Sequence, residues 1–203
     1  MTTDAPKSIP VDSPSGPLPP ATAWRAVARC VVESARMLTT GVVRWPRLNV
    51  GRRLRFADGT TGGVYRETAV AREPLEPCLL VVCFRLRLVR GRGHTLFRWE
   101  SWLNTPLFVG FPGFVSKLWL ADDEQGRYRG VYEWDGADRA EHYARSLWRV
   151  LALVSEPGSI DFRVVPGLHR DEVLADPSLL GSLGSLGRTE PAAPDWWRPA
   201  STS

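Results

Sequence analysis

The side chains best suited to acid–base chemistry near neutral pH are three histidines, His94, His142 and His169. An unperturbed imidazole changes its charge near pH ~6.5. A metal site needs at least three converging ligands, and none of these histidines lies four residues from another, the spacing that pairs them on one helix face. The chain also lacks a nucleophile elbow, a glycine-rich phosphate loop after a strand, an HExxH motif and a CxxC motif. No metal site is therefore predicted.

Two of the histidines can be either catalytic or surface residues. His94 follows a Gly-rich turn at the start of an expected helix, where it either faces a pocket as a catalytic base or caps the helix at the surface. His142 falls on the polar side of another expected helix. We expect it to be solvated.

Aromatic residues are the strongest chemical signal, because nine tryptophans in 203 residues exceed what a core of this size requires. Each of them alone suits a core position. As a group they suit a flat apolar ligand, to which indole N–H and phenol O–H groups can donate. The predicted pocket residues are Trp99, Trp102, Phe108, Phe111, Trp119, Tyr132, Trp134 and Trp148, with Asn104 and Arg163 as polar anchors.

Composition indicates a soluble globular protein, with 43% hydrophobic and 24% charged residues and a formal net charge of +4. The basic residues form no run, so no nucleic-acid partner is predicted. No apolar segment is long enough to cross a bilayer and no secretory signal is recognised, so we expect a cytoplasmic protein with no membrane partner. The three cysteines, odd in number and partly in apolar surroundings, fit a reducing compartment.

Residues 78–165 have the pattern of one folded unit in the order β-α-β-β-α-β. Residues 78–89 alternate as a buried strand, and a short helix follows around Trp99. Residues 114–121 and 128–134 form a hairpin, residues 137 onward an amphipathic helix, and residues 160–165 the last strand. This order is that of a ferredoxin-like split β-α-β domain, an α+β fold.

The flanking segments predict an extension and two tails. Residues 1–20 are rich in Pro, Ser and Thr and are expected to be disordered, and residues 167–203 form a tail that is mobile unless Trp196 and Trp197 dock. Residues 21–77 hold a helix and a hairpin of residues 54–57 and 64–70. The helix is expected to pack its apolar residues on the domain and leave its basic side in solvent. The alternative for this basic side is a membrane or nucleic-acid surface. The apolar set is Trp24, Val27, Val31, Ala35, Leu38 and Val42, and the polar set is Arg25, Arg29, Glu33 and Arg36.

Three short motifs carry a family resemblance. They are GFxSKxWL at residues 113–120, GxYxW at residues 130–134 and AxxY at residues 140–143. Together they resemble the YdhR-like monooxygenases of the dimeric α+β barrel superfamily, which are related to the antibiotic biosynthesis monooxygenases. The resemblance covers residues 78–165 and implies a homodimer in which two ferredoxin-like sheets form a barrel.

The resemblance also implies an activity, the oxygenation of a polycyclic phenol or anthrone of polyketide type by O2 without a metal, with reduced flavin as a possible co-reactant. On this reading Trp99, Trp119 or Tyr132 stabilises the phenolate and His94 is the base. The alternative is a non-redox aromatic cyclase or small-molecule-binding protein on the same scaffold. A third hypothesis is an interaction module that uses the helix of Trp24 or the C-terminal tryptophans.

Overall fold

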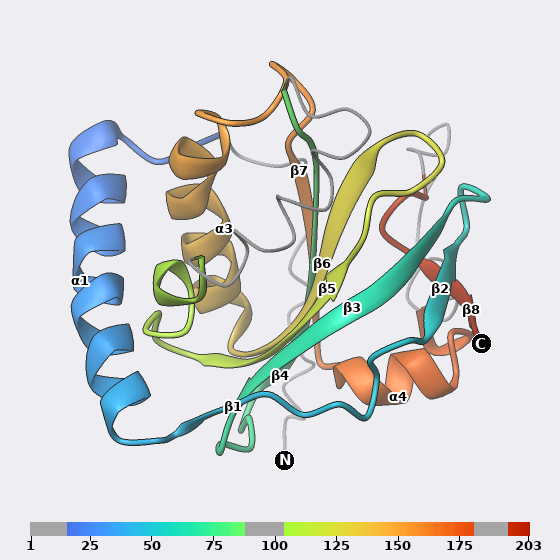
Figure 1. Ribbon diagram of the computed structural model, residues 1–203, viewed down its shortest axis with the longest axis horizontal. Helices are drawn as coiled ribbons and strands as arrows, with labels where there is room; N and C mark the ends of the chain where they lie inside the picture. The colour runs from blue at the N-terminus through green and yellow to red at the C-terminus, as the bar shows by residue number, and fades with distance from the viewer. Residues whose placement is uncertain (1–15, 88–103, 181–194) are drawn as a thin grey trace, which may run out of the picture.

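The computed structural model describes residues 16–87, 104–180 and 195–203. These residues form an α+β fold in which eight antiparallel strands make one curled sheet, shaped like half a barrel, with three helices packed on it (Figure 1). The helices are α1 (Pro20–Thr39), α3 (Ala137–Leu151) and α4 (Arg170–Ala175), and η1 (Thr105–Leu107) is a 3-10 turn. The strands are β1 (Val43–Arg44), β2 (Arg53–Phe56), β3 (Thr61–Val70), β4 (Pro77–Arg85), β5 (Phe114–Leu120), β6 (Arg127–Asp135), β7 (Asp161–Pro166) and β8 (Pro199–Thr202).

The sheet has the order β7-β4-β6-β5-β3-β2-β8, and β1 pairs with the end of β3. The strand β6 lies antiparallel between β4 and β5, and β4 lies antiparallel between β6 and β7. The strands β7 and β6 on either side of β4 are therefore parallel to each other, as are β4 and β5 on either side of β6. The helix predicted around Trp99 falls outside the described residues, whereas the hairpin of β5 and β6, helix α3 and strand β7 confirm the predicted elements.

The predicted N-terminal hairpin is confirmed as β2 and β3, and it belongs to the same sheet as the core unit. Strand β3 pairs with β5 over residues 64–69, so the extension continues the sheet beyond the core strands. The C-terminal residues add one more strand, because β8 pairs with β2. Segments from both ends of the chain thus extend the sheet.

Both faces of the sheet are covered by the chain itself. Figure 1 shows α1 and α3 on one side of the sheet and α4 on the other. The first layer includes Cys78, Leu80, Tyr132, Trp134 and Tyr143, all at most 2% exposed. The second layer lies beneath α4 and includes Leu79, Val131, Val173 and Trp196. The C-terminal tryptophan Trp196 therefore docks, which the sequence left open, and Cys78 and Cys83 are buried thiols as expected.

The orientation of α1 differs from the prediction. Its buried row is Ala23, Val27, Cys30 and Ser34, whereas Trp24 is 46% exposed and Val31 38% exposed. Small side chains occupy the buried row because the helix lies directly against the loop after η1. The Ser34 hydroxyl accepts a hydrogen bond from the Gly110 amide at 2.8 Å, and a Cβ atom on Gly110 would lie 2.3 Å from the Cys30 carbonyl oxygen. A larger residue in this row would push the helix away.

Candidate functional site

A buried lysine lies at the centre of the aromatic layer. Strand β5 is buried along its whole length, and its alternation puts Lys117 and Trp119 on the face that α1 and α3 cover. Lys117 stands directly opposite Tyr132 on β6 and Thr68 on β3. The amine thus enters the core from the middle of the sheet.

Three aromatic rings surround the Lys117 amine. Its Nζ atom lies 3.1 Å from the centre of the Trp119 ring, 4.7 Å from that of Phe108 and 4.8 Å from that of Tyr132. Ring faces attract a cation within about 6 Å. They carry no full negative charge, however, and cannot neutralise it.

No carboxylate of the described residues forms an ion pair with Lys117, which is itself only 6% exposed. Burial, with the Arg66 guanidinium as a second cause, holds the pKa of the Lys117 amine well below its ordinary value of 10.5. The ring faces favour the ammonium form and offset part of this shift. The net direction is a weaker proton affinity than that of an exposed lysine.

Arg66 supplies a second cation next to the same indole. Its guanidinium carbon lies 4.4 Å from the centre of the Trp119 ring, and its Nη2 atom donates to the Thr105 hydroxyl at 2.5 Å. Burial lowers the pKa of Arg66 to about 10, so the group remains charged at neutral pH. The indole N–H of Trp119 donates to the Thr68 hydroxyl at 3.2 Å, which fixes the ring beside the two basic groups.

The two tyrosines of the site share a hydrogen bond. Tyr143 Oη donates to Tyr132 Oη at 3.0 Å, and burial raises the pKa of both phenols. Gly130 makes room for this pair, since a Cβ atom there would lie 2.6 Å from Tyr132 Cε2. The glycine of the GxYxW motif therefore has a packing reason in this chain.

The structure brings together one part of the predicted pocket. Phe108, Trp119 and Tyr132 surround Lys117, and Phe111 and Trp134 extend the same layer through contacts with Tyr143. Asn104 is half-buried and adjoins Thr105, the hydrogen-bond partner of Arg66. His94, Trp99 and Trp102 lie outside the described residues.

Other predicted residues lie elsewhere. Arg163 is on the opposite face of the sheet, where its guanidinium carbon lies 5.4 Å from the centre of the Trp197 ring. Trp148 packs edge-on against Phe162 and lines a hollow of about 180 Å³ at the end of α3. This hollow also includes Arg87, Ser155 and Ile160, but none of the three rings around Lys117. His142 is exposed, as expected.

The sequence analysis did not select Lys117 or Arg66. A usable signal was present, because the chain has just two lysines, Lys7 and Lys117, and the second interrupts an apolar strand between Phe114 and Leu120. A lysine is almost never fully buried unless it is paired. Its place on the Trp119 side of the strand alternation would have pointed to the same cluster.

The described residues contain neither a metal-binding cluster nor a membrane-spanning helix. No group of three His, Cys, Asp or Glu side chains is arranged to hold a metal ion. In the same residues no helix has the length and apolar composition needed to span a bilayer.

Comparisons with known proteins add no relative. No protein-family model matches the chain, and neither a curated protein nor a solved structure was found to be similar to it. Any functional assignment therefore depends on the geometry around Lys117 together with the resemblance of the three motifs.

Proposed function

We propose that the protein binds a planar phenolic compound beside Lys117 and oxygenates it with O2 without a metal. The observation that carries the proposal is a buried amine, surrounded by three rings, with a second cation beside it and no carboxylate partner among the described residues. A charged Lys117 amine with no anion beside it is unfavourable in this core. The arrangement therefore favours binding of an acidic aromatic ligand.

The proposed first step is a proton transfer. A neutral Lys117 amine takes the phenol proton, which leaves an ammonium ion next to a phenolate, and Arg66 adds a second positive charge. A buried ion pair is far more stable than either charge alone, so the site stabilises the anion when it forms. General-base catalysis of this kind contributes about 10²- to 10⁴-fold in rate. Lys117 takes the role that the sequence analysis gave to His94.

The second step uses the electrons of the substrate. For an anthrone, Lys117 removes a proton from the ring CH2 group and leaves the enolate. The enolate gives one electron to O2, the carbon radical and superoxide join to form a C–O bond, and the peroxide anion takes the proton back from the Lys117 ammonium ion. The hydroperoxide then loses water to give a quinone, so one oxygen atom enters the product and the other leaves as water. For a simple phenol, hydroxylation consumes two further electrons, and reduced flavin would supply them as a co-substrate.

The proposal also includes a specific fold type, a ferredoxin-like unit. The strand order β7-β4-β6-β5 and helix α3 support a ferredoxin-like unit of the dimeric α+β barrel type. In such a dimer the open face of each sheet meets its partner. Here α4 and Trp196 cover that face, so a homodimer of this chain would have to use another surface.

The main alternative is a cyclase or a non-catalytic binding protein at the same site. A base that deprotonates an aromatic precursor also promotes ring closure with loss of water. Product mass separates the two reactions, because oxygenation adds an oxygen atom and cyclisation removes water. Tight binding of a phenol with no product would favour a binding protein, and partner binding through α1 would favour an interaction module.

The test is oxygen uptake with an anthrone, with and without reduced flavin. We expect uptake by the wild-type protein and a loss of about 100-fold or more in Lys117→Met, which keeps the length and apolar character of the side chain. Lys7→Met is the matched control and should retain full activity. No uptake under either condition, or equal uptake by Lys117→Met, would overturn the proposal.

A further inference from the structure

The exposed half of α1 presents two different rows of side chains. Residues 24, 28, 31 and 35 form one row by their spacing of four, three and four positions, and they are Trp, Ala, Val and Ala. The next row is Arg25, Arg29, Val32 and Arg36. The buried row of Ala23, Val27, Cys30 and Ser34 lies on the other side of the apolar one. An exposed apolar row therefore lies between the core and a basic row.

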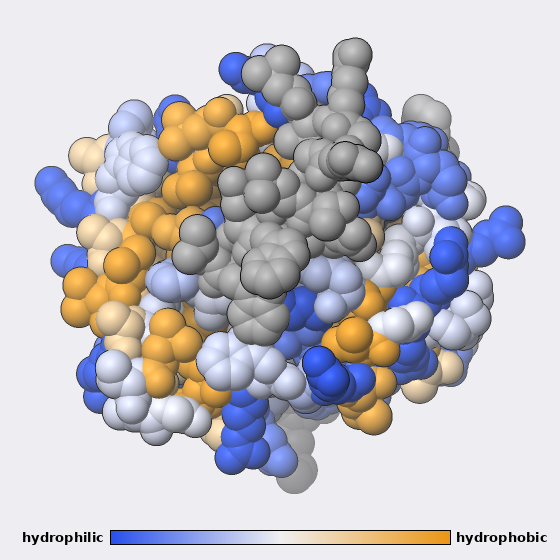
Figure 2. Space-filling model, viewed as in Figure 1, coloured by the Kyte–Doolittle hydropathy of each residue, from blue (hydrophilic) through white to orange (hydrophobic). Residues whose placement is uncertain are grey.

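The apolar row is exposed although the sequence pattern predicts that it packs on the domain. Trp24 is 46% exposed, and Val32, which lies between the arginines, is 73% exposed. Beyond the helix, Trp45 and Leu48 are exposed, and each directly follows an arginine, Arg44 or Arg47. Figure 2 shows apolar side chains next to hydrophilic ones along the edge of the molecule that α1 forms.

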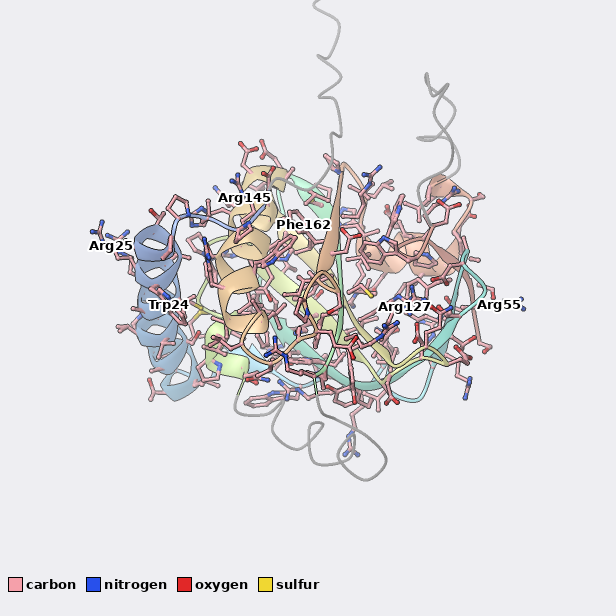
Figure 3. All side chains as sticks on the ribbon, turned by 90° about the horizontal axis from the view of Figure 1, so that it is seen from above. Trp24, Arg25, Arg55, Arg127, Arg145 and Phe162 are labelled. Atoms are coloured by element: carbon pink, nitrogen blue, oxygen red, sulfur yellow. The ribbon has the colours of Figure 1, made fainter. Side chains whose placement is uncertain are left out.

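The charge of this segment is mostly positive. From residue 20 to residue 48 the chain has five arginines and a single acidic residue, Glu33, whereas the whole chain has a formal charge of only +4. Glu33 pairs with Arg36 at 2.7 Å. Arg25 and Arg29 form no ion pair with any described residue. In Figure 3, Arg25 points away from the sheet on the outer side of α1.

We propose that α1 docks the protein on an anionic lipid surface, with the helix axis in the plane of the interface. Helices that lie in a membrane interface pair an apolar row containing Trp or Leu with a basic face. Indole rings settle at the headgroup level, and arginines extend from their edge to lipid phosphates. A nucleic acid would match the arginines but would leave Trp24, Val31 and Val32 without apolar partners. This surface is distinct from the Lys117 site and does not depend on its function.

The test is co-sedimentation of the full chain with vesicles of phosphatidylglycerol and phosphatidylcholine. We expect binding that falls with added salt and is weak on pure phosphatidylcholine. Arg25→Glu and Arg29→Glu should each weaken binding by about fivefold or more, since each arginine near an anionic surface contributes roughly that factor. Val32→Asp should weaken it at least as much, because it puts a charge among the inserted side chains.

Two exposed positions away from α1 provide controls. Arg55 lies on β2 at the opposite end of the molecule (Figure 3), so Arg55→Glu makes the same change of charge outside the proposed surface. Leu153 is 67% exposed beyond α3, and Leu153→Asp matches the change at Val32. Both variants should bind vesicles like the wild type.

Four outcomes would overturn the proposal. One is an absence of binding to anionic vesicles at low salt, and another is equal binding by the variants on α1 and by the controls. The third is a dimer in native mass spectrometry that Val32→Asp dissociates, together with no vesicle binding, which would make α1 a contact between two copies of the chain. Stronger salt-dependent binding to duplex DNA than to vesicles would likewise contradict a lipid partner.

Discussion

The Lys117 amine lies 3.1 Å from the centre of the Trp119 ring, and the Arg66 guanidinium carbon lies 4.4 Å from the centre of the same ring. One indole thus lies against two basic groups in the interior of the protein. Proteins ordinarily pair buried charges with opposite ones, because desolvation of an isolated charge is costly. Without an opposite charge beside them, these two basic groups reduce the stability of the core.

Lys117→Met is expected to change the pH dependence of stability. The folded-state pKa of Lys117 lies below its unfolded value of 10.5, so the unfolded chain binds more protons between these two values. The free energy of unfolding contributed by Lys117 therefore rises with pH through this window and stays constant above it. In Lys117→Met this rise should be missing. Urea unfolding of both proteins at several pH values measures it, and identical profiles would contradict the shift.

Gly130→Ala should destabilise the aromatic layer. The new Cβ atom would lie 2.6 Å from Tyr132 Cε2 and 2.9 Å from its Oη, so the ring must shift and disturb its hydrogen bond with Tyr143. We expect a loss of about 1 to 3 kcal/mol in the free energy of unfolding, as for other overpacked cores. The control is Gly63→Ala in β3, where nothing lies within 4 Å and the change should be neutral or slightly stabilising. Equal effects of the two substitutions would contradict this account.

Asp123→Asn should weaken the buried ion network that joins the two hairpins. Asp123 Oδ2 lies 2.7 Å from Arg129 Nη1 and 3.0 Å from Arg127 Nε, and Asp58 contacts the same two arginines. Removal of one charge should cost about 3 kcal/mol, because it leaves a buried arginine short of its partner. Glu73→Gln, at an exposed position, is the control and should change stability little.

The same network predicts an acid dependence. Burial alone would raise the pKa of Asp123, but hydrogen bonds from the Arg127 and Gln125 amides and the charge of Arg129 outweigh it and lower that pKa below 3.8. Its stabilising contribution is then complete above the unfolded value and is lost as the pH falls through the folded one. The difference between wild type and Asp123→Asn should therefore shrink below pH 3.8. A constant difference down to low pH would show that the charge of Asp123 does not matter.

Trp196→Ala should show that the C-terminal residues belong to the fold. Trp196 is 7% exposed, and its carbonyl oxygen accepts a hydrogen bond from Arg129 Nε at 3.0 Å. Truncation of a buried tryptophan costs about 3 to 5 kcal/mol. Trp24→Ala, at a tryptophan that is 46% exposed, should cost under about 1 kcal/mol. Thermal unfolding of both variants decides this, and equal losses would contradict the docking of Trp196.

Most of the sheet could be predicted from the sequence because the strands alternate clearly. The hairpin of β5 and β6, strand β7 and the pairing of β2 with β3 all follow from local patterns. The pairing of β3 with β5 and of β8 with β2 could not be predicted, since these contacts join residues far apart in the chain. Local periodicity does not predict pairing between distant strands.

The candidate site was predicted in part for a related physical reason. Aromatic residues such as Trp119 and Tyr132 stand out by type, and alternation assigns them to one face. The chemical role of Lys117 depends on its surroundings, which include no carboxylate partner among the described residues. The orientation of α1 was predicted wrongly for a different reason. Hydrophobicity favoured Trp24 as the buried residue, whereas close packing against Gly110 required Cys30 and Ser34.

The proton affinity of Lys117 is the most direct test of a neutral amine in the aromatic layer. Since the chain has only two lysines, protein labelled with ¹³C at lysine Cε gives two titrating NMR signals, and Lys7→Arg leaves the Lys117 signal alone. We predict a titration midpoint well below 10.5 in the free protein and a higher midpoint when 2-naphthol is bound, because the phenolate stabilises the ammonium ion. A midpoint at or above 10.5 in the free protein would contradict the role of Lys117 as a base.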